Sequence, residues 1–452
     1  MKFIDLFAGL GGFHKALAEL GHECVFASEI NRELQAVYEN NFGLKPFGDI
    51  RAIIKTELDR IPDHDILCAG FPCQPFSKAG KQLGRDDQDH GGLFDNIVEV
   101  LGVRKPKYFI LENVPFIAKH DNEATWNYMK EELERVGYQV DHRNYSPHQF
   151  GIPQHRLRIY IVGSLRELEC KFDFSVVVAE MEPLTDLQTY LSGTTDIGRS
   201  LPEKNIRQLD LWQEFLDQLP RDVDLPGVPI WAMEFGATYP FEDKPPAKFN
   251  STELGKYRGS FGVQLGDRRK ADQMANIPRY SHGLRKFPEW KKHFIRTNRN
   301  FYAKYRNHLE KVTAKIAESE FFSWQKLEWN VDKTKRNIRD YLIQFRASGI
   351  RVKEANYFPS LVCTNTQTPI IGWEDRYISK YEASRLQALS GLELPQNDNA
   401  AFRALGNAVN AKIVRIIARH LLDTGSTEFQ GDRNVVATCN SHSIGVGSFS
   451  SS

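Results

Sequence analysis

KFIDLFAGLGGFHKALAELG, residues 2–21, combines a short apolar run, a glycine-rich turn and an amphipathic segment. The apolar run predicts a buried strand, and the periodic segment predicts a helix that ends at Gly21. The same pair of patterns recurs in CVFASEI (24–30) and NRELQAVYENNFG (31–43). Further strand-like runs follow in HDILCAGFP, KYFILENV and RIYIVG, all before residue 164. Strands and helices that alternate in this way predict an α/β domain with a parallel sheet and right-handed crossovers.

Chemically distinctive residues stand directly after several of these predicted strands. They are the glycine-rich segment Asp5–Gly12, Glu29, the segment Gly70–Gln74, and the pair Glu112–Asn113. In parallel sheets, functional groups collect beyond the carboxyl ends of the strands. A glycine-rich turn there lets the backbone approach a nucleotide-like ligand, although tight packing alone is the other explanation for such a turn. We therefore expect a site at this edge of the sheet.

Composition and charge bound the class of protein. The chain has 452 residues, a formal net charge of +1 and 41% hydrophobic residues, which is typical of two or three soluble globular domains. No apolar run approaches the roughly 18 residues that a membrane span needs. Asp5 and the early glycines argue against a signal peptide. Six scattered cysteines predict neither a disulfide framework nor a zinc site, so we expect a cytoplasmic protein without a metal.

The remainder of the chain is less regular. Residues 164–359 are rich in loops and prolines, and predict a second domain with its own small core. Within it, the window from Arg268 to Arg306 contains 12 Lys+Arg and 2 Asp+Glu, interleaved with aromatic residues. This window is either a solvated face or a surface that follows phosphates. Residues 380–392 and 401–422 each predict one helix, and the Gly/Ser-rich residues after 424 predict a disordered tail.

AGFPCQPFSKAG, residues 69–80, holds Cys73 between two prolines. Because proline fixes its own φ and favours an extended residue before it, Cys73 is predicted to stay at the strand end. A free cysteine by itself is more often a small buried hydrophobic residue. Two nearby motifs favour a reactive role: ENV (112–114) offers a carboxyl group, and QHRLR (154–158) offers two guanidiniums on one face of an extended chain.

FIDLFAGLGGF, GDI, AGFPCQPFSKAGKQLG, ENV, QHRLRIYIVG, RLQ and GNAV occur in this order. The series resembles the motifs of the cytosine-C5 DNA methyltransferases of bacterial restriction–modification systems, over about residues 1–163 and 375–422. The resemblance implies an α/β, Rossmann-like, S-adenosylmethionine-dependent methyltransferase sheet with a second, smaller, irregular target-recognition domain. The expected boundaries are 1–163 for the catalytic domain, completed by 400–424, then 164–375 for recognition, 376–399 for a connecting helix, and 425–452 for the tail.

The resemblance also implies catalytic roles. Cys73 would be the nucleophile, Glu112 would meet cytosine N3, and Arg158 would hold the flipped base. Arg156 would steady its loop and a nearby phosphate. The implied catalytic set is Pro72, Cys73, Gln74, Glu112, Arg156 and Arg158.

For the cofactor, S-adenosylmethionine, the resemblance implies a pocket without a metal. Phe7 would stack on the adenine, Glu29 would hold the ribose, Asp49 would bond the adenine amino group, and Asn407 would close the methionine end. The implied set is Asp5, Phe7, Ala8, Gly9, Gly11, Gly12, Glu29, Ile30, Asp49, Ile50, Leu93, Asn407 and Ala408.

The target atom explains these residue types. Cytosine C5 becomes nucleophilic once a thiolate adds at C6 and a proton reaches N3. Because C5 is inaccessible inside a duplex, the base must leave the stack. The polar stretch 77–92 suits a lid that fills the vacancy, and the phosphate-rich partner calls for cations in the recognition domain. The expected DNA contacts are Ser77, Lys81, Gln82, Arg346, Arg351 and Lys353.

Three other functions deserve comparison with DNA methylation. An RNA cytosine methyltransferase would share the motifs, but the large basic recognition region argues against it. A cysteine hydrolase that pairs Cys73 with His155 would leave the glycine turn and ENV unexplained. A catalytically inactive DNA-binding regulator conflicts with the complete motif set. The expected partners are duplex DNA and a restriction endonuclease that acts on the same site, and we expect a monomer.

Overall fold

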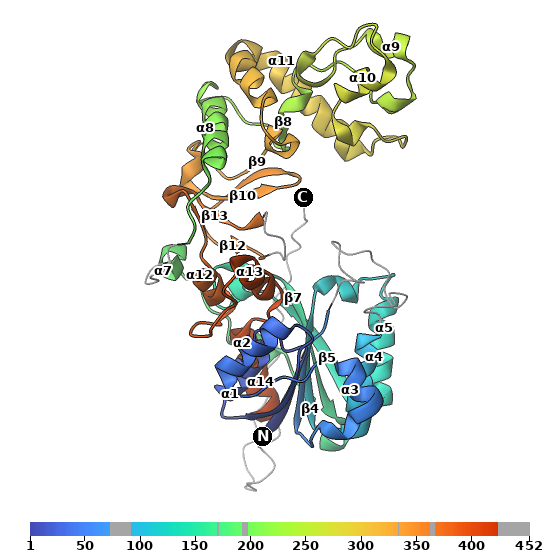
Figure 1. Ribbon diagram of the computed structural model, residues 1–452, viewed down its shortest axis with the longest axis vertical. Helices are drawn as coiled ribbons and strands as arrows, with labels where there is room; N and C mark the ends of the chain where they lie inside the picture. Colours follow the sequence, from blue (N-terminus) through green and yellow to red (C-terminus); the bar gives the residue numbers. More distant parts are fainter. Residues whose placement is uncertain (73–91, 170, 192–197, 333, 362–366, 424–452) are drawn as a thin grey trace, which may run out of the picture.

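The computed structural model describes residues 1–72, 92–169, 171–191, 198–332, 334–361 and 367–423. They form two lobes, one above the other in Figure 1, each built around a sheet. The lower lobe contains the N-terminal strands together with the last helix, and the upper lobe contains the middle of the chain. The predicted tail and most of the predicted lid lie outside the described residues. Among the described residues, no helix is both long and apolar enough to cross a membrane.

The sheet of the lower lobe has the strand order β2–β1–β3–β4–β7–β5. Its strands are β1 Lys2–Leu6, β2 Glu23–Ser28, β3 Ile66–Gly70, β4 Tyr108–Asn113, β5 Tyr138–Tyr145 and β7 Arg158–Leu165. Strands β2, β1, β3 and β4 are parallel, as predicted, but β7 runs antiparallel to both of its neighbours. The link from β5 to β7 lacks an α-helix that could cross the sheet, so the chain turns back and β7 returns antiparallel.

Helices cover both faces of this sheet. One face packs against α1 Gly12–Ala18 and α14 Ala411–Asp423, with α2 Arg32–Phe42 beside them, and the other against α3 Ile50–Glu57, α4 Leu93–Arg104 and α5 Ala124–Arg135. Strand residues alternate between these layers: Ile66 and Cys68 join the first apolar cluster, while Leu67 and Ala69 join the second. The period of two therefore builds a sheet that is buried on both faces.

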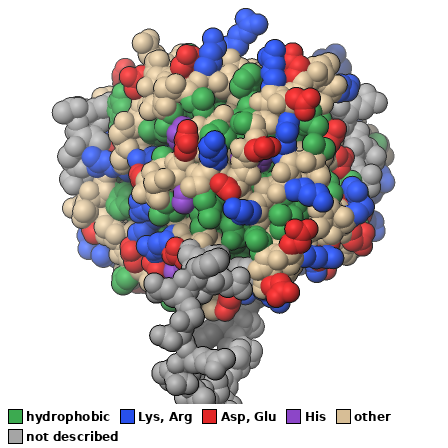
Figure 2. Space-filling model, turned by 90° about the horizontal axis from the view of Figure 1, so that it is seen from below, with side chains coloured by type: hydrophobic (Ala, Val, Ile, Leu, Met, Phe, Trp, Pro, Cys, Tyr) green, Lys and Arg blue, Asp and Glu red, His purple; other side chains and the backbone are tan. Residues whose placement is uncertain are grey.

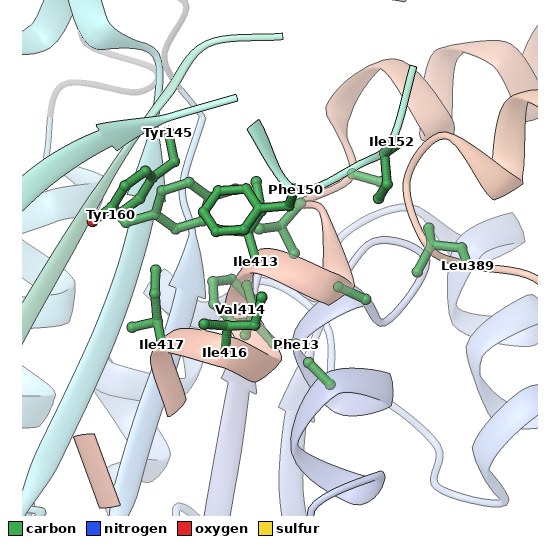
Figure 3. Close-up of a cluster of buried hydrophobic side chains, with 14 of the residues drawn as sticks. Phe13, Tyr145, Phe150, Ile152, Tyr160, Leu389, Ile413, Val414, Ile416 and Ile417 are labelled. Carbon is green, nitrogen blue, oxygen red and sulfur yellow. The ribbon is translucent and has the colours of Figure 1, made fainter. Parts of the chain in front are cut away.

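The C-terminal segment packs into the lower lobe. In Figure 3, Ile413, Val414 and Ile417 of α14 lie against Tyr160 of β7 and Phe13 of α1. Gly12 makes the close approach possible, because a Cβ there would lie 2.5 Å from Cγ1 of Val409. Helix α14 therefore packs into the same apolar core as β1 and α1.

The single helix predicted over 401–422 is wrong: α13 Asp398–Asn407 and α14 are separate. The chain is extended at Ala408, with ψ 143°, and the Ala408 carbonyl accepts a hydrogen bond from Nη2 of Arg156 at 2.9 Å. Asn410 then accepts from the backbone N–H of Ile413 at 3.2 Å, which starts α14. The predicted helix is therefore interrupted at the residue whose carbonyl is bonded to a side chain from a distant part of the chain. The other predicted C-terminal helix, over 380–392, is shorter than expected: α12 spans Lys380–Arg385.

The upper lobe is more regular than its sequence predicts. Its sheet has the order β14–β13–β10–β11–β9–β8, with β8 Ile230–Trp231, β9 Lys326–Asn330, β10 Leu342–Arg346, β11 Gly349–Lys353, β13 Ile370–Ile371 and β14 Arg376–Tyr377. Its helices are α8 Glu203–Asp217, α9 Ser251–Gly255, α10 Lys270–Ala275 and α11 Glu289–Ala317, whereas α6 Ser175–Val178 and α7 Leu187–Leu191 pack into the apolar cluster that contains α1 and α14. One apolar cluster joins α8 and α11 to the sheet, and a second lies around Trp231 and Leu254. The predicted separate core is thus present.

A short parallel pair joins the two lobes. Strand β12, Phe358–Pro359, pairs with β6, Gln154–His155, just before β7. Nε2 of Gln387 donates to Oε1 of Gln154 at 2.7 Å and ties the same segment to the chain beyond α12. The QHRLR segment therefore lies at the junction between the lobes.

The opposite end of the molecule carries charges of both signs. Figure 2 shows Lys and Arg interspersed with Asp and Glu on this lower surface, separated by small apolar areas. Arg104, for example, pairs with Asp59 at 3.3 Å and with Asp63 at 3.7 Å. A surface of mixed sign does not favour a polyanion, so this end is a poor candidate for nucleic-acid contact.

Candidate active site

A cavity of about 350 Å³ lies at the carboxyl ends of the parallel strands. Residues from the turns after β1, β2, β3 and β4 line it, together with residues from the end of α13. The structure brings all of the predicted cofactor residues to this cavity except Asp5 and Gly11. Of the predicted catalytic residues, Pro72, Glu112, Arg156 and Arg158 also line it. Cys73 and Gln74 lie outside the described residues.

Glycine geometry shapes the turn after β1. Gly9 and Gly11 have φ values of 54° and 79°, a region that favours glycine, and Phe7 has φ 58°. Asp5 lies at 0% exposure beneath this turn, and burial raises its pKa well above the usual value. Asp5 is therefore buried within β1 and does not line the cavity.

Glu29 holds the glycine turn in place. Its Oε2 accepts the backbone N–H of Gly9 at 2.9 Å, and its Oε1 accepts that of Asn31 at 2.8 Å. A carboxylate oxygen has a second lone pair, so each oxygen retains capacity for a ligand hydroxyl. Glu29 therefore fixes the glycine turn, and its predicted contact with a ribose stays a prediction.

Asp49 is already engaged by a residue that the sequence analysis missed. Its carboxylate caps α3 by accepting a hydrogen bond from the backbone N–H of Arg51 at 3.0 Å. Its Oδ2 also accepts a hydrogen bond from Nη2 of Arg51 at 2.7 Å. Hydrogen bonds from the Arg51 side chain lower the pKa of Asp49. Arg51 itself lines the cavity. In the sequence, the signal for this pair was that Arg51 stands two positions after Asp49, an acidic residue at a helix start.

Glu112 ends β4 as a buried carboxyl group, with 6% of its surface exposed. Nε of Arg158 lies 3.2 Å from its Oε1, yet within the described part of the chain Oε1 accepts no well-oriented hydrogen bond. Burial raises the pKa of Glu112 above its usual value, and the charges of Arg158 and Arg156 oppose that shift. Such a carboxyl group holds a proton more readily than an exposed glutamate does.

Arg156 and Arg158 both line the cavity, in agreement with their spacing, but their guanidiniums contact different partners. Arg158, at the start of β7, lies beside Glu112, whereas the 2%-exposed Arg156 donates to the carbonyl of Ala408. Arg156 therefore ties the QHRLR segment to the chain between α13 and α14, and its predicted phosphate contact stays a prediction.

Known proteins share both the sequence and the fold. A family model described as C-5 cytosine-specific DNA methylase matches residues 1–223. The type II methyltransferase M.AluI of Cellulosimicrobium cellulans is 30% identical over an alignment of 496 positions, which covers 92% of this chain and 91% of that protein. The chain belongs to the C-5 cytosine-specific DNA methylases.

Other comparisons agree with this membership. The type II methyltransferase M.HaeII of Haemophilus aegyptius is 42% identical over 227 residues, 50% of this chain and 67% of that protein. The crystal structure of a DNA modification methyltransferase from an E. coli prophage has a TM-score of 0.53 at 19% identity, over 94% of this chain and 99% of that one, and shows the same fold. The predicted family, fold class and enzyme class are confirmed: the protein is a DNA (cytosine-5-)-methyltransferase.

Asn113 of this methyltransferase ends β4 beside Glu112, as the sequence predicts, but no role was predicted for its side chain. Its Nδ2 donates to the carbonyl of Phe71 at 3.2 Å, and its Oδ1 accepts the backbone N–H of Val114 at 2.8 Å. Phe71 and Pro72 directly precede Cys73 in the sequence. The ENV motif therefore anchors the chain that leads into the predicted nucleophile as well as supplying a carboxyl group.

The predicted DNA contacts of the methyltransferase divide into two groups. Ser77, Lys81 and Gln82 lie outside the described residues. In the upper lobe, Arg346 and Arg351 both pair with Glu328. Nζ of Lys353 donates to the carbonyl of Tyr357 at 2.9 Å, and burial lowers the pKa of this lysine to about 8. These three cations are therefore held by neighbours within the upper lobe.

Some cations of the basic window 268–306 have partners within the protein, and others are exposed. Lys291 lies 5.0 Å from the ring centre of Phe287, and Arg299 pairs with the buried Glu234 at 2.9 Å. Arg285 and Lys286 are exposed. Part of the positive charge thus stabilises this segment, and part remains on its surface. Among the described residues, no cluster of His, Cys, Asp or Glu could hold a metal ion.

Proposed function

We propose that this methyltransferase transfers a methyl group from S-adenosylmethionine to C5 of a cytosine flipped out of duplex DNA, through a covalent bond between Cys73 and C6. The observation that carries the proposal is the position of Glu112. A carboxyl group with a raised pKa lines the same cavity as Phe7, Glu29 and Asn407. Proton donor and nucleotide-binding residues therefore meet in one place.

The residues present fit S-adenosylmethionine. A cavity of about 350 Å³ lies in the range of small-ligand pockets, roughly 300–1,000 Å³. Phe7 offers an aromatic face, the oxygens of Glu29 can each accept a ribose hydroxyl, and Asn407 lines the part formed by α13. Asp49 would bond the adenine amino group alongside Arg51. When bound, the cofactor supplies an electrophilic methyl group on a sulfonium.

The protein's own residues would prepare the cytosine. The Cys73 thiolate adds to C6, and the electrons of the C5–C6 double bond move toward C5 while Glu112 gives its proton to N3. C5 would then take the methyl group as the bond from that methyl to the sulfonium sulfur breaks, and the thioether left would be S-adenosylhomocysteine. A base removes the C5 proton, the electron pair re-forms the double bond, and the C6–S bond breaks. The proton on N3 returns to Glu112. Arg158, which lies beside that carboxyl group, would hold the extruded base.

Two features support a reactive Cys73. The cavity that contains Pro72 also contains the cations Arg156 and Arg158, and positive charge favours a thiolate. Asn113 fixes the carbonyl of Phe71, so the chain enters the predicted nucleophile from an anchored point. A nucleophile positioned in this way would lower the entropic part of the activation free energy for addition to C6.

The organisation of the whole enzyme is part of the proposal. Residues 1–163 and 400–424 would form the catalytic domain, 164–375 the target-recognition domain, and 376–399 the connection between them. The enzyme would act as a cytoplasmic monomer on duplex DNA, and a cognate restriction endonuclease would cut the same site. Relatives named type II methyltransferases support that setting.

The test uses the full chain, labelled S-adenosylmethionine, and duplex DNA or tRNA. We expect label in DNA cytosine for the wild type, and none for Cys73→Ser. The matched control, Cys24→Ser, should retain activity, because Cys24 is a free cysteine on β2 that does not line the cavity. Duplex DNA with 5-fluorocytosine should trap a covalent complex with the wild type and with Cys24→Ser. Label in tRNA alone, or trapping that survives Cys73→Ser, would refute the proposal.

A further inference from the structure

The sheet of the upper lobe has one apolar face and one polar face. Alternate residues of β9, β10 and β11 enter the apolar core: Leu327, Ile343, Phe345, Ile350 and Val352. The intervening positions include the buried Leu342 and five polar side chains, of which Gln344 is buried and the other four are partly exposed. We call these five the recognition face: Glu328, Gln344, Arg346, Arg351 and Lys353. The period of two therefore gathers charged side chains from three strands onto one surface.

This recognition face continues to the rim of the active-site cavity. Lys353 donates to Tyr357, whose ring lies 5.8 Å from that of His155 on β6. Three residues after His155, Arg158 lines the cavity. In Figure 1 the upper sheet lies above the end of the lower lobe toward which β7 and its neighbours extend. A duplex whose target base enters the cavity would consequently run beneath the recognition face.

At the centre of the recognition face, one carboxylate lies between two guanidiniums. Nη2 of Arg346 pairs with Oε2 of Glu328, and Nε of Arg351 lies 3.3 Å from Oε1. Arg351 and Glu328 stand opposite each other in the parallel register of β11 and β9. The three side chains remain partly exposed, at 20% for Arg346, 23% for Glu328 and 31% for Arg351. They are held in a fixed arrangement and can still reach a partner.

The carboxylate of Glu328 favours contact of this face with base edges over contact with phosphates alone. A glutamate repels phosphates, so a surface that only follows the DNA backbone gains nothing from Glu328. In the major groove, a guanine–cytosine pair presents two acceptors on guanine and, beside them, the amino donor of cytosine. An arginine complements the guanine edge, and a glutamate complements the cytosine amino group. An adjacent arginine and glutamate therefore match the two halves of one base pair.

We propose that Glu328, together with Arg346 or Arg351, reads a guanine–cytosine pair in the recognition sequence of this methyltransferase, at a position other than the target cytosine. The inference rests on the proposed function, because it requires duplex DNA against this face. It assigns a specificity-determining role to Glu328, whose alternative is a purely structural ion pair between β9 and β11.

The test compares wild type with Glu328→Gln on a library of duplexes with randomised bases around the target cytosine. Bisulfite sequencing gives the methylation rate for each base at each position. The wild type should require a guanine–cytosine pair at one flanking position. Because glutamine pairs well with adenine, Glu328→Gln should accept adenine–thymine there, and discrimination should fall by about tenfold or more. Other positions should keep their preferences.

Glu214→Gln is the matched control. Glu214 of α8 forms an exposed pair with Lys315 of α11 in the same lobe, at 2.6 Å, away from the recognition face. Its substitution should leave every base preference unchanged. Arg351→Lys, which keeps the charge but loses the planar fork, provides a second measurement if Glu328→Gln melts at a lower temperature, and it should relax the same position.

The outcomes separate the two proposals. A wild type that methylates no cytosine in DNA contradicts the proposed function. A wild type with a defined site, together with substituted enzymes that keep the same preferences, overturns the inference and leaves the function standing. Uniformly tighter binding of Glu328→Gln to all sequences would also overturn it, because that result shows simple charge repulsion.

Discussion

Replacement of Glu112 by Gln tests the proposed proton donor with little change of shape. The side chain is buried at the end of β4, and glutamine has nearly the same volume, so packing in the cavity is preserved. Glutamine has no acidic proton to give to cytosine N3. The substitution therefore removes the chemistry and leaves the site otherwise in place.

The size of the effect follows from the role. A positioned general acid contributes about 10²–10⁴-fold to a rate, which corresponds to about 3–5 kcal/mol of transition-state stabilisation. The raised pKa of Glu112 suits this role, because burial keeps the proton on the carboxyl group to a higher pH than in an exposed glutamate. We expect single-turnover methyl transfer to slow by at least about a hundredfold, with DNA affinity changed little.

The same pKa predicts how stability varies with pH. Since the folded protein binds the proton of Glu112 more tightly than the unfolded chain does, the associated stability is fully present below the unfolded pKa, about 4.3. It is lost as pH rises through the folded pKa. Glutamine does not titrate, so wild type should lose stability relative to Glu112→Gln as pH rises above about 4.

The assay is rapid-quench transfer of labelled methyl to a saturating duplex, alongside thermal melting from pH 4 to 8. Glu131→Gln, on the exposed surface of α5, controls for loss of a carboxylate. A Glu112→Gln rate within about threefold of wild type, well short of the expected hundredfold loss, would refute the proton-donor role. A melting difference that stays constant with pH would contradict the raised pKa.

Two further predictions concern the cofactor site and the sheet. Asp49→Asn should weaken S-adenosylmethionine binding by about tenfold in calorimetry, because a charged acceptor is lost, while the cap of α3 survives in asparagine; an unchanged Kd would show that Asp49 serves only Arg51. Gly163→Ala should lower the free energy of unfolding by about 1–3 kcal/mol in urea titrations, because its Cβ would lie 2.1 Å from the ring of Phe109. Gly227→Ala meets no atom within 4 Å and should change it by less than about 0.5 kcal/mol; equal losses at the two glycines would contradict the packing argument.

Much of the cavity was predictable from local sequence. The apolar runs place Phe7, Glu29 and Glu112 at the carboxyl ends of parallel strands, and the topology of such sheets brings those ends together. The motif order then indicated the family that the comparisons confirm. No structural fact was needed for either step, because a strand period and a glycine turn are properties of neighbouring residues.

Other features depended on partners far away in the chain. The pattern over 401–422 predicts one helix, yet the bond from Arg156 to the Ala408 carbonyl accompanies a break that brings Asn407 to the cavity. The direction of β7 likewise depends on how the chain returns from β5. Local propensity is worth less than about 1 kcal/mol per residue, so a single buried hydrogen bond can outweigh it.

The sequence by itself determined the alternation of strands and helices, the residues at the strand ends, and the family. The tertiary structure decided which charges neutralise one another: Arg299 pairs with the distant, buried Glu234, and Glu328 lies between two arginines from other strands. The reason is physical. Periodicity is set by the geometry of one segment, whereas the environment of a charge is set by whatever the fold packs against it.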